Sequence, residues 1–214
     1  MRYVSNIICP AKFNYEKYKD IIINDVFKNV DLDKIENIVQ EKILNNKFPI
    51  RKKSSSIVFG EIVEFYFKEK YYKFCEYQRK IIYQDIVGKC DFYCIDKIIE
   101  IKYSTFIPVD RIIEIYKYQV YFYSYIFNKN KWVIVALNPV EDEIRIEEGT
   151  INQKDINIIK SIINGDNLTL RIDLHCIYCN IQGCPVKKLL NKKEDRKTTR
   201  LNSSHRTVSR MPYH

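Results

Sequence analysis

Apolar residues recur along this chain with two different periods. Between Pro10 and about Asn46, and again from Ser56 to about Phe74, they fall at the three- and four-residue intervals of an amphipathic helix. Shorter runs rich in Ile, Tyr and Val have the character of strands. In chain order, the pattern predicts helices at 10–46 (broken at 29–33) and 56–74, strands at 79–87, 89–93 and 98–102, a helix at 109–127, strands at 131–137 and 143–147, and a helix at 152–164. This order predicts an α/β fold in which helices flank a mixed sheet.

The strand predicted at 98–102 carries charged residues inside an apolar run. Because side chains alternate between the faces of a strand, Glu100 and Lys102 share one face while the isoleucines beside them point into a core. Asp91 lies on the preceding strand, where a turn at 96–97 would bring its carboxylate beside that of Glu100. Two carboxylates and an ammonium group on one sheet edge can hold a divalent metal and orient a water molecule. A solvated face of alternating charge is the alternative, since 29% of the residues are charged.

Two predicted helices offer further candidate residues. Glu61 and Glu64 lie three residues apart on the helix that precedes the strands, so they share a face. Either is an ordinary surface acid unless this helix packs against the sheet edge, where one would supply a further oxygen ligand. Gln119 and Tyr123 lie one turn apart on the helix that follows the strands. The other aromatic residues of that helix are expected to pack in the core.

The formal net charge of the 214-residue chain is +9, which suits a polyanionic partner such as a nucleic acid. Residues 192–214 contain seven Lys and Arg residues against two Asp and Glu, so more than half of the excess lies there. This tail has the character of translated adapter or vector sequence. We therefore expect a single domain at 1–190 and a disordered basic tail at 191–214.

No apolar run approaches the roughly 18 residues that a membrane span needs, and the N-terminus lacks a signal-peptide pattern. We therefore expect a cytoplasmic protein with no membrane partner. Seven cysteines in such a chain are not expected to form a disulfide framework. Three of them, Cys75, Cys90 and Cys94, lie in or near strands, where a thiol is expected to act as a small buried hydrophobe.

The remaining cysteines suggest a metal centre. Cys176, Cys179 and Cys184 have the spacing Cys-x2-Cys-x4-Cys, which lets three thiolates converge in a tight loop. A fourth ligand would be the adjacent His175 or, better, Cys9 if the ends of the chain meet. Such a set suits Zn²⁺ or an iron–sulfur cluster. Its first role would be structural, because binding adds folding free energy.

Six motifs follow one another over about residues 7–190. They are Cys9-Pro10-Ala11-Lys12, Gly60-x3-Glu64, Gly88-x2-Asp91, Glu100-x-Lys102, Gln119-x3-Tyr123 and the closing Cys176, Cys179 and Cys184. In this order they resemble the RecB-like nucleases of the PD-(D/E)XK superfamily that carry an iron–sulfur cluster, in particular the small CRISPR-associated exonucleases and their virus-encoded relatives. The family has histidine where this chain has Glu64, which substitutes a harder oxygen ligand.

The resemblance implies a restriction-endonuclease-like fold and a set of site residues. Glu64, Asp91 and Glu100 would hold Mg²⁺ or Mn²⁺, and Lys102 would orient the attacking water. Gln119 and Tyr123 would position the nucleic-acid strand, with Tyr123 as a candidate to stabilise Lys102 or the phosphate. The cluster ligands would be Cys9, Cys176, Cys179 and Cys184, with [4Fe-4S] favoured and zinc as the alternative.

The resemblance also implies a substrate and partners. The expected activity is metal-dependent cleavage of single-stranded DNA or DNA ends, as an exonuclease. The expected role is trimming of spacer precursors in CRISPR adaptation, beside the CRISPR integrase. A virus-encoded nuclease that processes DNA ends, and a nucleic-acid-binding adaptor of the same fold without turnover, are the alternatives.

Overall fold

The computed structural model describes residues 1–45 and 53–191. Residues 46–52 and the predicted tail at 192–214 lie outside the described residues. Two compact units are distinguished. The first comprises residues 1–22 and 47–171, and the second comprises residues 23–46 and 172–214. In the described part of the chain, no helix combines the length and apolar character that a bilayer crossing requires.

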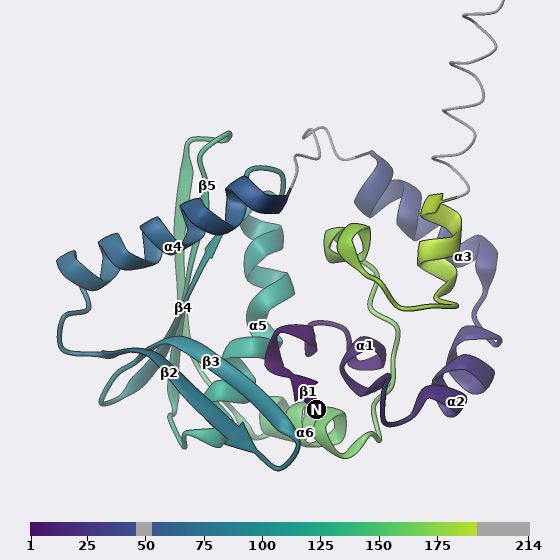
Figure 1. The fold of residues 1–214 in the computed structure, drawn as a ribbon, viewed down its shortest axis with the longest axis horizontal. Coiled ribbons are helices and arrows are strands. Elements are labelled where there is room, and N and C mark those ends of the chain that lie inside the picture. Colours follow the sequence, from purple (N-terminus) through teal and green to yellow (C-terminus); the bar gives the residue numbers. More distant parts are fainter. Residues whose placement is uncertain (46–52, 192–214) are drawn as a thin grey trace, which may run out of the picture. The chain divides into compact units, whose positions relative to one another are not determined.

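The first unit contains a mixed sheet of six strands, as the sequence predicts for the fold class (Figure 1). Its strands are β1 (Arg2–Tyr3), β2 (Glu76–Tyr83), β3 (Ile86–Tyr93), β4 (Lys97–Tyr103), β5 (Lys131–Asn138) and β6 (Glu143–Thr150). Strand β3 pairs with β2 along one edge and with both β1 and β4 along the other. The pairs β1–β3 and β4–β5 are parallel, and the other three are antiparallel.

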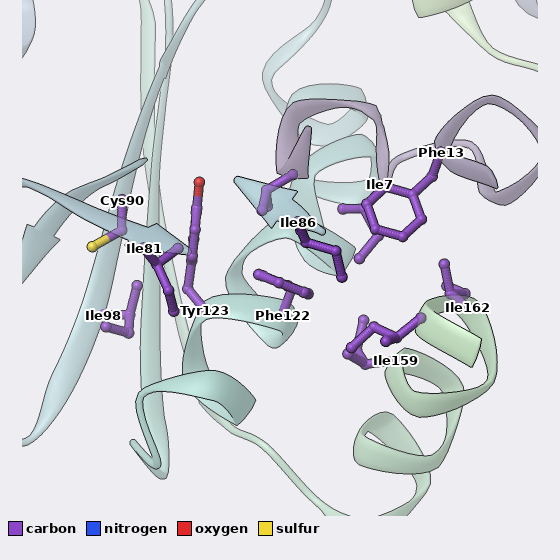
Figure 2. Packing of buried hydrophobic residues seen from close by; sticks show 12 residues of the cluster. Ile7, Phe13, Ile81, Ile86, Cys90, Ile98, Phe122, Tyr123, Ile159 and Ile162 are labelled. Carbon is purple, nitrogen blue, oxygen red and sulfur yellow. The ribbon is translucent and has the colours of Figure 1, made fainter. Parts of the chain in front are cut away.

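Helices cover both faces of this sheet. The first unit has α1 (Pro10–Asn14), α2 (Lys19–Ile21), α4 (Lys53–Lys70), α5 (Val109–Ile126) and α6 (Gln153–Asn164), together with a short 3-10 helix at Val4–Asn6. On one face, Phe67 of α4 packs with Ile99 of β4. On the other, α5 and α6 pack with Ile98 of β4. Figure 2 shows Phe122 of α5 and Ile159 of α6 in this second core.

The second unit is helical and joins segments that are far apart in sequence. It contains α3 (Leu32–Val39), π-helical turns at Ile22–Phe27 and Gln40–Leu44, a 3-10 helix at Leu174–Tyr178 and a final helix at 185–191. Asp31 caps α3 by accepting a hydrogen bond from the Lys34 amide. Ile35 and Val39, one turn apart, are buried. The predicted break at 29–33 is therefore real.

The predicted strand at 79–87 is wrong, because the chain reverses within it. Residues 84–85 form a turn between β2 and β3, and Gln84 has a left-handed φ of 55°. Our expectation for Cys75 and Cys94 is also wrong, since these residues form a disulfide with a Cα–Cα distance of 4.5 Å. The two errors are connected, because the β2–β3 register that follows from the turn brings the ends of these strands together. Cys90 is a buried thiol, as predicted.

A buried arginine ties the N-terminus to the rest of the first unit. Arg2 is only 4% exposed. Its guanidinium donates to both carboxylate oxygens of Asp85, at 2.6 and 2.9 Å, and to Asn14 Oδ1 at 2.8 Å. It also donates to the carbonyl oxygen of Ile163 at 2.7 Å. One side chain therefore joins β1, the β2–β3 turn, α1 and α6.

Replacing Arg2 by Met should lower the free energy of unfolding by about 2–4 kcal/mol, because it strips hydrogen bonds from buried acceptors. Asp85→Asn should cost less, since the Asp85 carboxylate is half-exposed.

The Arg2 hydrogen bond lowers the pKa of Asp85. The stabilisation from Asp85 is therefore present above about pH 4 and is lost as the pH falls through the lowered pKa. Urea titrations of the three proteins would measure this, and equal stabilities would contradict the role assigned to Arg2.

Candidate active site at a gap in the sheet

One edge of β3 changes partner along its length. Near its start, Val87 pairs with Tyr3 of β1. Near its end, Phe92 pairs with Ile99 of β4. Among the described residues, no strand pairs with this edge between those two points. Interior backbone groups need hydrogen-bond partners, and here side chains supply them.

Tyr123 of α5 fills the first part of this gap. Its hydroxyl accepts a hydrogen bond from the Lys89 amide at 3.0 Å and donates to the Lys89 carbonyl oxygen at 2.8 Å. Gly88 makes the approach possible, because a Cβ there would lie 3.0 Å from the tyrosine ring and 2.5 Å from Val4 Cγ2. Burial raises the pKa of Tyr123, and a hydrogen bond with the buried Gln119 opposes this. The Tyr123 hydroxyl thus contacts the β3 backbone, and its expected role in stabilising Lys102 or a phosphate stays a prediction.

Asp91 and Glu100 fill the second part of the gap, and each carboxylate accepts a backbone amide from the other strand. The Asp91 amide lies 3.3 Å from Glu100 Oε1, and the Ile101 amide lies 2.7 Å from Asp91 Oδ2. Lys102 Nζ bridges the two carboxylates, at 2.5 Å from Glu100 Oε2 and 3.3 Å from Asp91 Oδ2. The three side chains that the sequence singles out are therefore in direct contact.

The electrostatics of this group follow from its burial. Glu100 is fully buried and Asp91 is 6% exposed. Burial and then the charge of Asp91 raise the pKa of Glu100 to about 8, although Lys102 opposes the shift. Burial would lower the pKa of Lys102, but Asp91 and Glu100 together outweigh it and hold that pKa well above its ordinary value. Lys102 is therefore a charged ammonium group at neutral pH.

Tyr116 of α5 also contacts this group, although the sequence analysis did not identify it. Its ring centroid lies 5.2 Å from Lys102 Nζ, within the range of a cation–π interaction. The helical spacing contained the signal, because Tyr116 precedes Gln119 by three residues and so shares its face.

Glu64 of α4 lies close enough to Asp91 for the two charges to interact. Burial and then the charge of Asp91 raise the pKa of Glu64. Glu64 Oε2 accepts hydrogen bonds from the Tyr77 hydroxyl at 3.3 Å and from Gln78 Nε2 at 3.2 Å. Burial and then Glu64 raise the pKa of Tyr77 to about 12. The sequence analysis missed both β2 residues, because their position depends on the β2–β3 register.

The chemistry of these donors suits a hard divalent cation. Glu64, Asp91 and Glu100 offer carboxylate oxygens, which Mg²⁺ and Mn²⁺ prefer. Burial and then the charge of Asp91 raise the pKa values of Glu64 and Glu100, and a cation bound beside them would favour their ionised forms. Over residues 1–45 and 53–191, however, no three His, Cys, Asp or Glu side chains are grouped closely enough to hold a metal ion. The three carboxylates are thus suitable metal ligands by their chemistry, and Asp91 and Glu100 are the two that lie together.

The second unit carries three of the four predicted cluster cysteines. Cys176, Cys179 and Cys184 are all buried. The Cys179 amide donates to the Cys176 carbonyl oxygen at 3.1 Å, which closes the turn between them. His175 Nε2 lies 3.6 Å from Cys176 Sγ. Cys9 is also buried but belongs to the first unit, where it precedes α1, so its participation stays a prediction.

The chain is similar to known proteins in structure and not detectably in sequence. No protein-family model matches the chain, and no curated protein is detectably similar to it in sequence. Among solved structures, SSO0001 is 21% identical, with a TM-score of 0.48 over 83% of this chain and 81% of the other. A phage-related exonuclease from Haemophilus somnus 129PT is 15% identical, with a TM-score of 0.47 over 76% and 90%. Similarities of this size are too low to carry an argument about function.

The buried carboxylates should make stability depend on pH in a defined direction. An acid whose pKa is raised in the folded state contributes stability that is present below its unfolded pKa and lost as the pH rises through the folded value. For Glu100 this window runs from 4.5 to about 8. We expect the metal-free protein to lose stability across it, by a few kcal/mol at most, since one pKa unit corresponds to about 1.4 kcal/mol.

The Glu100→Gln variant tests this, because it keeps the side-chain shape and removes the titrating group. Urea titrations in EDTA between pH 5 and 8 should show a shallower loss of stability than in the parent protein. An unchanged slope would mean that another group titrates in this window.

Proposed function

We propose that this protein is a metal-dependent nuclease that hydrolyses phosphodiester bonds in DNA. The observation that carries the proposal is the contact between Asp91, Glu100 and Lys102 at the gap in the sheet. Paired carboxylates beside an ammonium group suit phosphodiester hydrolysis, in which negative charge must be held in place and new charge must be stabilised. The net charge of +9 suits a polyanionic substrate.

Each residue has a distinct task in this proposal. Asp91 and Glu100, with Glu64 assisting, would hold Mg²⁺ or Mn²⁺, which would polarise the phosphate and lower the pKa of a bound water. The water would attack phosphorus and lose one proton to solvent, the bond to the leaving oxygen would break, and that oxygen would take up a proton from solvent. Lys102 is protonated, so it orients the water and offsets the charge that develops on the phosphoryl oxygens. It does not act as a general base.

In this proposal Tyr123 and Gln119 do not touch the reacting atoms and act through the backbone of β3. Tyr123 holds the β3 backbone at Lys89, two residues from Asp91, and Gln119 holds the Tyr123 hydroxyl. They therefore fix the position of Asp91 in the gap. This is a structural task, and the positioning of the nucleic-acid strand that the family resemblance implies for these two residues stays a prediction beside it.

The finer parts of the proposal rest on the family resemblance. We propose single-stranded DNA or DNA ends as the substrate and exonuclease action as the mode. Trimming of spacer precursors beside a CRISPR integrase is the corresponding cellular role, and end processing by a virus-encoded relative is its alternative. An iron–sulfur cluster on Cys9, Cys176, Cys179 and Cys184 completes the proposal, with zinc as the alternative metal.

The nuclease proposal is tested by incubating the protein with Mn²⁺ and single-stranded DNA labelled at either end. We expect cleavage that EDTA abolishes. Asp91→Ala and Lys102→Ala should each reduce the rate about 100-fold or more, because each removes a charge that acts in the transition state. Asp96→Ala is the matched control, since Asp96 lies on the same hairpin but is exposed and paired with Lys131.

Cleavage at the parental rate by the Asp91 and Lys102 variants would refute the assignment of the site. DNA binding that is equal with and without EDTA, with no cleavage, would favour the non-catalytic adaptor instead.

The cluster is tested by anaerobic purification followed by measurement of the visible spectrum and of iron, sulfide and zinc. We expect a coloured protein that contains iron and sulfide, and Cys179→Ser should remove both. Cys90→Ala is the control, because Cys90 is buried in the sheet core and is not among the predicted ligands. A colourless protein with stoichiometric zinc would establish the zinc alternative. A metal-free protein would refute both.

A further inference from the structure

Gln78 has an unusual backbone for a residue in the middle of a strand. Its φ of 56° lies in the left-handed region, which is costly for a residue with a side chain. Three other residues in the described part of the chain have a positive φ without being glycine: Gln84, Asn128 and Asp142. Those three lie in turns, where such angles are common. Gln78 therefore differs from them, because β2 continues on both sides of it.

The position of Gln78 relates this backbone to the candidate active site. The β2–β3 register pairs Tyr77 with Phe92 and Arg79 with Cys90, so Gln78 falls opposite Asp91. That pair is missing from the register, and the ladder resumes on either side of it. The distortion thus lies directly across from one of the paired carboxylates.

The left-handed backbone also redirects the Gln78 side chain. In a regular strand, neighbouring side chains point to opposite faces of the sheet. Tyr77 packs in the core under α4, so Gln78 would be expected to point to the other face. Instead, Gln78 Nε2 lies 3.0 Å from the Tyr77 hydroxyl, and both groups donate to Glu64 Oε2. Two consecutive strand residues therefore reach the same carboxylate oxygen.

We propose that Gln78 is a positioning residue of the site, whose strained backbone turns its amide toward α4 to hold the Glu64 carboxylate next to Asp91. This inference rests on the proposed function, since it assigns Glu64 to the divalent cation that the nuclease would use. Residues that hold a metal ligand in place commonly change metal affinity or activity 10- to 100-fold when they are replaced. The strain in β2 is then retained because it serves the site.

A pair of glycine substitutions separates this role from simple backbone strain. Gln78→Gly and Gln84→Gly relieve nearly the same left-handed angle, 56° and 55°. Each should raise the melting temperature slightly or leave it unchanged. Gln78→Gly should weaken Mn²⁺ binding about 10-fold, as measured from the electron paramagnetic resonance signal of unbound Mn²⁺. Gln84→Gly should leave it at the parental value, because the β2–β3 turn holds no carboxylate of the site.

Two further variants test whether Gln78 acts through Glu64. Tyr77→Phe removes the second donor and keeps the ring, so it should also weaken Mn²⁺ binding. Gln78→Gly in a Glu64→Ala background should cause no additional loss, because the effects of groups that act together are not additive. An additive loss would overturn the inference.

The failure of this inference is distinguishable from the failure of the proposed function. If the parent protein cleaves DNA in an Asp91-dependent manner but Gln78→Gly binds Mn²⁺ as well as Gln84→Gly does, the positioning role alone is wrong. A large drop in melting temperature for Gln78→Gly alone would mean that the side chain stabilises the fold instead, and would also overturn it. If the parent protein neither binds Mn²⁺ nor cleaves DNA, the proposed function is wrong and the inference falls with it.

Discussion

The incomplete hydrogen bonding along one edge of β3 is the constraint on which the site depends. Strands β1 and β4 leave part of that edge without a strand partner. The amide and carbonyl groups there would be costly to bury if nothing else formed hydrogen bonds with them. Tyr123 satisfies both backbone groups of Lys89, and Glu100 accepts from the Asp91 amide. The side chains that complete the sheet are therefore also those of the candidate active site. A substitution here affects folding and chemistry together, so the melting temperature of each variant belongs beside its activity.

This constraint also explains how acidic groups stay in the interior. Burying an unpaired carboxylate costs several kcal/mol, and the raised pKa of Glu100 reflects that cost. Asp91 and Glu100 each offset part of it by accepting a backbone amide, and Lys102 offsets more by bridging them. The offset is incomplete, because two carboxyl groups already share one ammonium group and Glu64 adds a third acid nearby. The divalent cation that we propose would offset more of this cost.

Sequence reasoning reached the parts of this arrangement that depend on local periodicity. The two-residue period of β4 places Glu100 and Lys102 together, and the short hairpin brings Asp91 to them. Sequence reasoning failed where the position of a residue depends on the register between two strands. The turn at 84–85 lacks glycine and proline, so the boundary between the first two predicted strands fell at residue 88, and the pairing that unites Cys75 with Cys94 was hidden. The same error concealed Tyr77 and Gln78, whose proximity to Glu64 no local pattern could show.

The β2–β3 register also determines which groups surround Glu64, at the position where the resembled nuclease family has histidine. Tyr77 and Gln78 both donate to Glu64 Oε2. A carboxylate oxygen can accept two donors, whereas a neutral imidazole has one acceptor nitrogen in total. If that nitrogen bound a metal, neither donor could use it. The carboxylate can accept both donors through Oε2 and keep Oε1 for a cation, so the donor pair on β2 suits glutamate better than histidine. The all-oxygen ligand set that we propose would favour Mg²⁺ and Mn²⁺ over softer metals.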